Sequence, residues 1–339
     1  MDTRVILFSS DATLLYKGDI FRVLALPEGH TIQFRYPKKY VAPSFRETPE
    51  QLVGKESVIF FLAGNDLSKP IEQRQLTSYP IRSCCVIEAF YDSNTQQIIM
   101  VLKLEKFVNC KVEDITDKAA LPPTTFVTVV NLEDLRPADW SDRVGAVESS
   151  FPKVLFYRIG GVMCGEKSIE PAYAPNLRLS RYILTEESEY SIECSYYDPE
   201  GNGITPLEVD ISSSDVDVRN LFESGAGARV DTRRLPLITR TLKSSSAPAY
   251  MKFRSGTYKS PDRDPNYVEI HWQLARASSK PMQFGFLTLI GAIGLFIANT
   301  GLKNPTGNSL DIKDLLLRAF GGLLIAIAAS FLFKVFNKV

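Results

Sequence analysis

The stretch from Ile81 to Val108 decides the fold class. It reads IRSCCVIEAFY over 81–91, DSNT over 92–95 and QQIIMVLKLEKFV over 96–108. Both flanks are rich in β-branched, aromatic and other apolar residues, which favour strands. The four residues between them favour a turn, because Asp, Ser and Asn side chains hydrogen-bond to nearby backbone. The stretch therefore predicts a β-hairpin, with Ile81–Tyr91 and Gln96–Val108 as its two strands.

Similar short apolar runs, bounded by turn residues, recur along most of the chain. They predict strands at Val5–Ser9, Thr13–Tyr16, Phe21–Leu26, Thr31–Arg35, Val154–Ile159, Tyr182–Leu184, Tyr190–Tyr197, Leu207–Ile211, Tyr250–Phe253 and Tyr267–Leu274. Helical periodicity is scarce, and only Thr48–Val53 and Ser214–Glu223 suit short helices. We therefore expect a mainly β chain, built as β-sandwiches or partly open barrels.

Length and a change in pattern predict two such domains. The chain has 339 residues, whereas one domain takes about 150. The segment RPADWSDRVGAVESSFP, residues 136–152, is the candidate boundary, and Pro122-Pro123 is a competing break. We expect an N-terminal β-rich domain at 1–140, a second β-rich domain at 152–278, and a transmembrane helical hairpin at 281–337.

The first predicted span of that hairpin is Met282 to Leu302. These 21 residues contain no charged side chain, and their centre reads FGFLTLIGAIGLFIAN. At 1.5 Å per residue the run covers about 30 Å, the thickness of the hydrocarbon core of a bilayer. A buried helix of a soluble domain is the alternative, but the length of the uncharged run favours a transmembrane helix.

The second predicted span, 315–335, depends on one arginine. Ala319–Phe333 gives only 15 uncharged residues, so the span must include Arg318. The Arg318 guanidinium would reach back to the headgroups, and Lys334 would mark the other interface. The connection TGLKNPTGNS, 300–309, is short and rich in turn formers, which predicts an antiparallel pair of helices.

Small residues recur four apart on both predicted spans. Such spacing lets helix backbones approach closely in lipid. It suits packing within the hairpin and a homo-oligomer equally well, and the sequence leaves both open. The residues are Gly294, Ala298, Gly322, Ala326 and Ser330.

Charges beside the spans hardly distinguish the two orientations. One side would carry Arg276, Lys280, Lys334 and Lys338, and the other Lys303, Lys313 and Arg318. The N-terminus, MDTRVILFSSDATLLYKGD, has too short an apolar run for a signal peptide. We therefore expect a membrane protein with two spans, its N-terminal domain and C-terminus in the cytoplasm, and loop 301–309 on the other side.

The net charge is zero, but charge is unevenly distributed. From Tyr182 to Val218 there are ten acidic residues and no lysine or arginine. From Arg229 to Arg263 nine basic residues face two acidic ones. One interpretation is that the two blocks pair as neighbouring strands. Another is that the basic block meets anionic lipid, at about 1 kcal/mol per basic side chain, while the acidic block meets a basic partner.

We expect lipid or polyanion contacts from Arg229, Arg233, Arg234, Arg240, Lys243, Lys252, Arg254, Arg276 and Lys280. Contacts to a basic partner are expected from Glu186, Glu187, Glu189 and Glu193. Nucleic acid is the weaker interpretation of the basic block, because no recognisable nucleic-acid-binding motif accompanies it.

No motif for chemistry stands out, and we predict no catalytic residue, no cofactor and no metal site. HExxH, GxSxG and GxxxxGK[ST] are absent. His30 is predicted in a turn and His271 in a strand, both as structural residues. The string Asp198–Gly203 resembles a calcium loop, but Val209 stands where a glutamate belongs, so a hairpin turn is predicted. The five cysteines have no CxxC spacing, which favours reduced thiols.

These features together predict a non-enzymatic, membrane-anchored recognition or effector subunit. Its β-rich part would bind a cytosolic protein partner and anionic lipid, and its hairpin would anchor it and perturb the membrane. The layout resembles that of prokaryotic membrane-acting immune effectors, including the membrane partners of short Argonautes, which implies a role in antiviral defence. The resemblance is one of layout and rests on no residue motif. A passive anchor or scaffold for a cytosolic enzyme, and a membrane-bound enzyme, are the alternatives.

Overall fold

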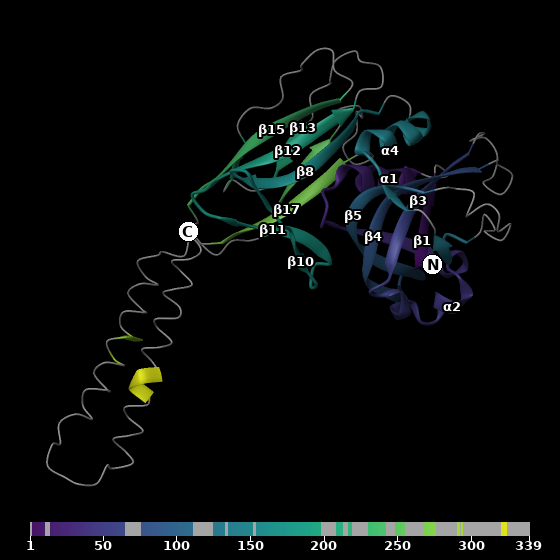
Figure 1. Ribbon diagram of the computed structural model, residues 1–339, viewed down its shortest axis with the longest axis horizontal. Coiled ribbons are helices and arrows are strands. Elements are labelled where there is room, and N and C mark those ends of the chain that lie inside the picture. Colours follow the sequence, from purple (N-terminus) through teal and green to yellow (C-terminus); the bar gives the residue numbers. More distant parts are fainter. Residues whose placement is uncertain are drawn as a thin grey trace, which may run out of the picture. The chain divides into compact units, whose positions relative to one another are not determined.

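The computed structural model divides the chain into two compact units, Met1–Ala275 and Arg276–Val339. It describes residues 2–10, 14–64, 76–110, 125–132, 135–151, 154–197, 208–212, 216–218, 230–241, 248–254, 267–275, 290–291, 293 and 320–323. The first unit is mainly β and contains several sheets, which confirms the predicted class (Figure 1).

The first sheet has seven strands and contains the hairpin that decided the class. Its order is β2-β5-β4-β3-β1-β6, and β7 pairs with β5. β1 and β3 are parallel, and the other neighbours are antiparallel. The strands are β1 (Asp2–Ser10), β2 (Thr31–Pro37), β3 (Glu56–Gly64), β4 (Leu76–Asp92), β5 (Gln97–Asn109), β6 (Val127–Leu132) and β7 (Arg136–Pro137). Pairing of Asp92 with Gln97 across the turn confirms the predicted hairpin.

The two edges of this sheet approach each other. The chain leaving β2 forms a parallel bridge between Val41 and Val127 of β6. The amide of Phe126 donates to the Tyr40 carbonyl at 2.7 Å, and the amide of Ala42 donates to the Val127 carbonyl at 2.9 Å. The sheet is therefore curled, and its otherwise open edge is satisfied by backbone hydrogen bonds.

A helix, α1 (Leu14–Ala25), replaces the strands predicted at Thr13–Tyr16 and Phe21–Leu26, so those two predictions were wrong. The buried residues Gly18, Phe21 and Ala25 recur at helical spacing. Ile20, Val23 and Leu24 are buried as well, because α1 is covered on more than one side. A short apolar run of this kind cannot be told from a strand by periodicity.

The other helices described in the first unit are short. Thr48–Val53, predicted as helical, contains a 3-10 turn, whereas Ser214–Glu223 contains a strand, Val216–Val218. The short helices are η1 (Lys38–Tyr40), α2 (Pro43–Arg46), η2 (Pro49–Leu52), α4 (Trp140–Val147) and η4 (Glu148–Ser150).

Arg82 fixes the C-terminal end of α1 to the sheet. Its side chain is 1% exposed and donates to the carbonyls of Val23 at 2.8 Å and Leu26 at 2.6 Å. A third hydrogen bond reaches the Glu105 carbonyl at 2.7 Å. The last carbonyls of a helix lack partners within it, and a cation there also suits the helix dipole. Burial, together with the Arg158 charge, lowers the pKa of Arg82 to about 9.

The second half of the first unit is a sandwich of two five-stranded sheets. One has the order β10-β11-β17-β16-β13 and the other β14-β15-β12-β8-β9. The Tyr157 hydroxyl of β8 donates to the Phe253 carbonyl of β16 at 2.9 Å and so links the sheets. The strands are β8 (Phe156–Cys164), β9 (Lys167–Ile169), β10 (Ala172–Ala174), β11 (Leu179–Thr185), β12 (Glu189–Tyr197), β13 (Glu208–Ile211), β14 (Val216–Val218), β15 (Val230–Thr239), β16 (Ala249–Arg254) and β17 (Tyr267–Ala275).

The curled sheet and the sandwich meet around α1 and β2. Phe21 of α1 packs on Phe156 and Tyr157, with ring centroids 5.9 and 5.2 Å apart. Farther along, the Tyr173 hydroxyl donates to Glu88 at 2.5 Å. This junction encloses the site described below.

The second unit covers the segment predicted as a transmembrane hairpin, most of which lies outside the described residues. Those described there, 290–291, 293 and 320–323, are helical. Within the described part of the chain, no helix is both long and apolar enough to span a membrane. Gly322 is described and exposed, whereas Gly294, Ala298, Ala326 and Ser330 lie outside the described residues.

Candidate functional site

A pocket of about 470 Å³ lies where the curled sheet meets the sandwich. We call it the α1 pocket. It is lined by residues of α1, by His30 and β2, by the start of β11 and by β17. Its volume lies within the range of about 300–1,000 Å³ that is usual for small-molecule sites. The lining comes from three segments far apart in sequence, around residues 15–35, 178–180 and 267–271.

The floor of the α1 pocket carries buried polar atoms. Both ring nitrogens of His30, Oγ1 of Thr31 and Oγ of Ser180 have no hydrogen-bond partner among the described residues. His30 is 2% exposed and Ser180 is 3% exposed. Each unsatisfied buried polar atom costs about 1–3 kcal/mol. Almost none of the surface of these atoms is exposed, so they lie just beneath the pocket surface, and a polar ligand would complete their hydrogen bonds after a small shift of the lining.

His30 stands in a turn, as predicted, but its ring is buried. The turn is held by the amide of Gly29 donating to the Leu104 carbonyl at 2.9 Å and by the amide of Leu104 donating to the His30 carbonyl at 2.8 Å. The imidazole packs on Tyr182, with centroids 5.2 Å apart. Burial, aided by the charges of Arg82 and His271, lowers the pKa of His30 to about 3. The ring is therefore neutral near pH 7 and offers one donor and one acceptor.

One wall of the pocket is an arginine–carboxylate group on α1 and β2. Nη1 of Arg22 donates to Oδ1 of Asp19 at 2.9 Å. Burial raises the pKa of Asp19 to about 6, although the Arg22 and Arg35 guanidiniums favour its charged form. Arg35 is exposed and lines the same wall. Two guanidiniums thus stand beside one carboxylate.

A second wall is formed by β17. Oε2 of Glu269 lies 3.6 Å from Nε2 of His271, and Oε1 lies 3.7 Å from Nζ of Lys252. The His271 hydrogen bond is the main cause that lowers the pKa of Glu269. Tyr267 lies between the Arg22 guanidinium, 5.1 Å from its ring centroid, and the Lys252 ammonium, 3.7 Å away. The charges of this wall are largely compensated by one another.

The sequence did not reveal this site. His30 and His271 were each interpreted as structural, and nothing in the spacing of residues 30 and 271 places them at one pocket. The available signal was composition, because these are the chain's two histidines and both line the pocket.

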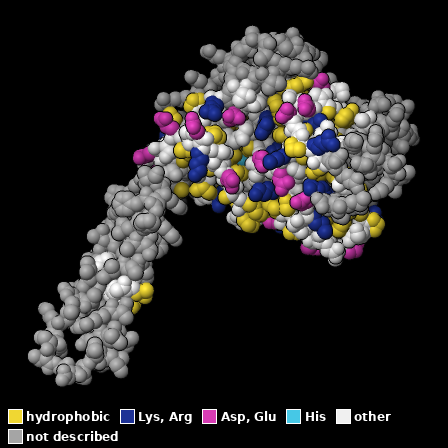
Figure 2. Space-filling view, in the orientation of Figure 1, with side chains coloured by type: hydrophobic (Ala, Val, Ile, Leu, Met, Phe, Trp, Pro, Cys, Tyr) yellow, Lys and Arg dark blue, Asp and Glu magenta, His cyan; other side chains and the backbone are white. Residues whose placement is uncertain are grey.

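The acidic and basic blocks lie largely on the sandwich, where several of their residues pair. β12 runs antiparallel to β15, and Oε2 of Glu193 lies 3.7 Å from Nε of Arg234. β13 runs antiparallel to β16, and Oδ2 of Asp210 lies 2.9 Å from an Nη atom of Arg254. On the face drawn in Figure 2, acidic and basic side chains are interspersed among the described residues. These contacts support the interpretation that the blocks pair as neighbouring strands.

The other residues predicted to bind lipid or a partner differ in exposure. Arg240, Glu187 and Glu189 are exposed, and Glu186 is half-buried. Arg233 lies in β15. Arg229, Lys243, Arg276 and Lys280 lie outside the described residues, as does the string Asp198–Gly203.

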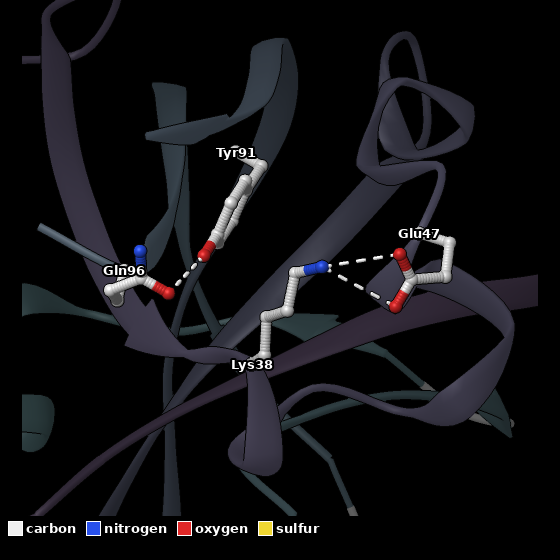
Figure 3. A network of polar contacts seen from close by, with 4 residues as sticks. All are labelled: Lys38, Glu47, Tyr91 and Gln96. Atoms are coloured by element: carbon white, nitrogen blue, oxygen red, sulfur yellow. Dashed lines mark hydrogen bonds and ion pairs between the residues drawn. The ribbon is translucent and has the colours of Figure 1, made fainter. Parts of the chain in front are cut away.

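A second polar cluster, beside the β4–β5 turn, is fully paired (Figure 3). Nζ of Lys38 lies 3.2 and 3.3 Å from the two carboxylate oxygens of Glu47, and 4.3 Å from the ring centroid of Tyr91. The Tyr91 hydroxyl donates to Oε1 of Gln96 at 2.5 Å. This cluster stabilises the turn and leaves no buried polar atom for a ligand.

Other chemistry is not evident in the described residues. Among them, no three His, Cys, Asp or Glu side chains are grouped as metal ligands would be. Gly160 lies inside β8 as the extra residue of a bulge, without a paired residue in β12, and a Cβ on Gly160 would meet the Glu193 carboxylate at 2.8 Å. All five cysteines are free thiols, and Cys164 is the exposed one.

Comparison with known proteins identifies no family for this chain. No protein-family model and no curated protein sequence matches it. Among solved structures, the secreted serine protease VesC from Vibrio cholerae aligns over 77% of this chain and 72% of its own, at 9% identity and a TM-score of 0.24. A similarity at that level carries no argument about fold or activity.

Proposed function

We propose that this chain is a non-enzymatic recognition subunit, tethered to a membrane by its C-terminal hairpin, whose β-rich unit binds a polar ligand in the α1 pocket. The observation that carries the proposal is the floor of that pocket. His30, Thr31 and Ser180 bring buried polar atoms together with no hydrogen-bond partner among the described residues. Binding sites commonly hold such groups at a cost in stability, because the ligand completes their hydrogen bonds.

Substitutions that remove those groups test the proposal without any ligand. We expect Thr31→Val and Ser180→Ala each to raise the free energy of unfolding by about 1 kcal/mol, because an unsatisfied buried hydroxyl is removed. Ser83→Ala is the matched control, since Ser83 is 7% exposed but donates to the Lys106 carbonyl at 3.1 Å. That control should lower stability. If Thr31→Val and Ser180→Ala lower stability as well, the floor serves the fold and the proposal fails.

The membrane tether rests on the 21 uncharged residues from Met282 to Leu302. A chain ending at Ala275 retains the whole first compact unit. We expect the full chain in the membrane fraction of cells and the shortened chain in the supernatant after high-speed centrifugation. If the full and the shortened chain divide equally between membrane fraction and supernatant, the C-terminal segment is not a membrane anchor. Cross-linking of the full chain would show whether the hairpin also assembles oligomers.

Contacts with anionic lipid and with a basic protein partner are further parts of the proposal. Arg234 and Arg240 are exposed on the strand and segment that carry the basic block. We expect Arg234→Glu with Arg240→Glu to weaken binding of the 1–275 fragment to phosphatidylglycerol vesicles. Unchanged binding to the vesicles would show that the basic block serves only to pair with the acidic block in the fold.

A membrane-bound enzyme is the second candidate, and the walls of the α1 pocket favour it. Asp19, with a pKa of about 6, is suited to proton transfer near neutral pH, and Glu269 and His271 lie 3.6 Å apart in the lining of the same pocket. A passive anchor would leave the pocket without a ligand. Incubating the protein with a ligand that it binds, and following that ligand by mass spectrometry, separates recognition from turnover.

A further inference from the structure

We infer that the α1 pocket binds a sugar phosphate, free or as part of a nucleotide, with its hydroxyl groups on the floor made by His30, Thr31 and Ser180 and its phosphate beside Arg22 and Arg35. This inference rests on the proposed function and specifies the class of ligand. It follows from the hydrogen-bonding capacity of the floor, the charge of the wall and the size of the pocket.

The floor suits hydroxyl groups. Thr31 and Ser180 each offer a hydroxyl that can donate and accept, and neutral His30 offers one donor and one acceptor. A sugar hydroxyl likewise donates and accepts, so it can match every group on this floor. A carboxylate would match only the donors of this floor, because an ionised carboxylate accepts hydrogen bonds and donates none. The ligand therefore has an uncharged, hydroxylated part.

The wall suits one anionic group. The lining contains three arginines, Arg22, Arg35 and Arg178, against two carboxylates, Asp19 and Glu269. Arg178 is neutralised by Glu88, 3.4 Å away, and Glu269 is neutralised by Lys252. The remaining excess of one positive charge lies with Arg22 and Arg35, which share the single carboxylate of Asp19.

Guanidinium groups are the preferred partners of phosphate. Arginine presents five N–H donors in a planar fork, which bind phosphate oxygens in pairs. In Arg22 one of these nitrogens, Nη1, is engaged with Asp19. Arg35 is exposed, and its charge favours the ionised form of Asp19. The pocket volume of about 470 Å³ accommodates a ligand of this class.

Isothermal titration calorimetry on the full chain in detergent micelles tests the inference. The probes are ribose 5-phosphate, glucose 6-phosphate and adenosine monophosphate, with ribose, adenosine and inorganic phosphate as partial ligands. We expect at least one of the three phosphate esters to bind with a dissociation constant below about 1 mM, at least about tenfold more tightly than any partial ligand. The ester that binds best distinguishes a free sugar phosphate from a nucleotide.

Two charge reversals locate the phosphate. Arg35→Glu should weaken binding of the esters at least about tenfold, because it replaces an attraction by a repulsion. Lys167→Glu is the matched control, since Lys167 is an exposed cation in β9 that does not line the pocket, and it should change binding less than about twofold.

The outcomes separate the ligand class from the function. If no phosphate ester binds, or if Arg35→Glu and Lys167→Glu have equal effects, the inference is overturned. Binding of ribose or adenosine as tightly as their phosphates also overturns it, while leaving the recognition role intact. The recognition role is decided separately by the ligand-free stability of Thr31→Val and Ser180→Ala.

Discussion

Arg82 and His30 are both buried polar residues beside the C-terminal end of α1, and they differ in one respect. The Arg82 guanidinium donates to three backbone carbonyls. The His30 ring, which is close enough for the Arg82 charge to affect its pKa, has no hydrogen-bond partner among the described residues. Around Arg82 the buried donors and acceptors are paired with one another. The ring nitrogens of His30 are left without a partner in the described part of the protein, and a ligand would supply one.

The difference separates structural from functional polarity in this molecule. A buried charge is tolerated where all its hydrogen bonds are made, and its removal then exposes several backbone groups at once. A buried neutral group without partners weakens the fold. If this difference between paired and unpaired buried groups holds, substitutions should have their largest effect at Arg82, a smaller one at His30, and the smallest at an exposed ion pair on the surface.

Arg82→Ala should have the largest effect. The carbonyls of Val23, Leu26 and Glu105 would lose their shared donor inside the core, so we expect the free energy of unfolding to fall by about 3–5 kcal/mol. Chemical denaturation followed by circular dichroism measures this change. Lys167→Ala, at an exposed position, should change stability by less than about 0.5 kcal/mol. A loss of under about 1 kcal/mol at Arg82 would show that α1 is held by packing alone.

His30→Gln should change how stability depends on pH. The pKa of His30 is about 3 in the folded protein and about 6.5 when unfolded, so between these values the unfolded chain binds more protons. Folding stability conferred by this residue is therefore lost as pH falls below about 6.5. From pH 7 to 4.5 the wild type should lose on the order of 2 kcal/mol more than His30→Gln.

The paired design of that measurement is needed because Asp19 acts in the opposite direction. Its pKa is raised by burial to about 6, so the folded state binds the extra proton and gains stability as pH falls from about 6 to 4. Both proteins carry Asp19, and its contribution cancels in their difference. Parallel pH curves for the two proteins would show that the His30 ring is accessible to protons in the native state.

The sequence allowed prediction of the strands whose burial alternates or whose turn is explicit. The hairpin of β4 and β5, and β12 and β17, follow from local patterns that depend on near neighbours alone. α1 was missed because Phe21 to Leu26 is buried on several sides, and that removes the polar face by which a helix is recognised.

The α1 pocket could not be predicted, for a different reason. His30, Ser180 and His271 come together only when the sandwich packs against the curled sheet, and no local pattern encodes that contact. The charge blocks were visible, because sequence reports charge directly. What the sequence could not decide was their pairing, which depends on β12 lying beside β15 rather than beside another strand.

The smallest effect is expected where Glu193 meets Arg234. The pair is 3.7 Å apart, and its side chains are 36% and 57% exposed, so water and salt screen the attraction. We expect Glu193→Gln, Arg234→Gln and the double variant to differ in stability by no more than about 0.5 kcal/mol, with a coupling energy near zero at 0.5 M salt. A coupling above about 1 kcal/mol that persists in high salt would show that this surface pair contributes to the fold as the buried group at Arg82 does. Burial and complete hydrogen bonding would then no longer distinguish the charges that stabilise the fold from those that do not. Arg234 would also be committed to Glu193, and so less available for contact with anionic lipid.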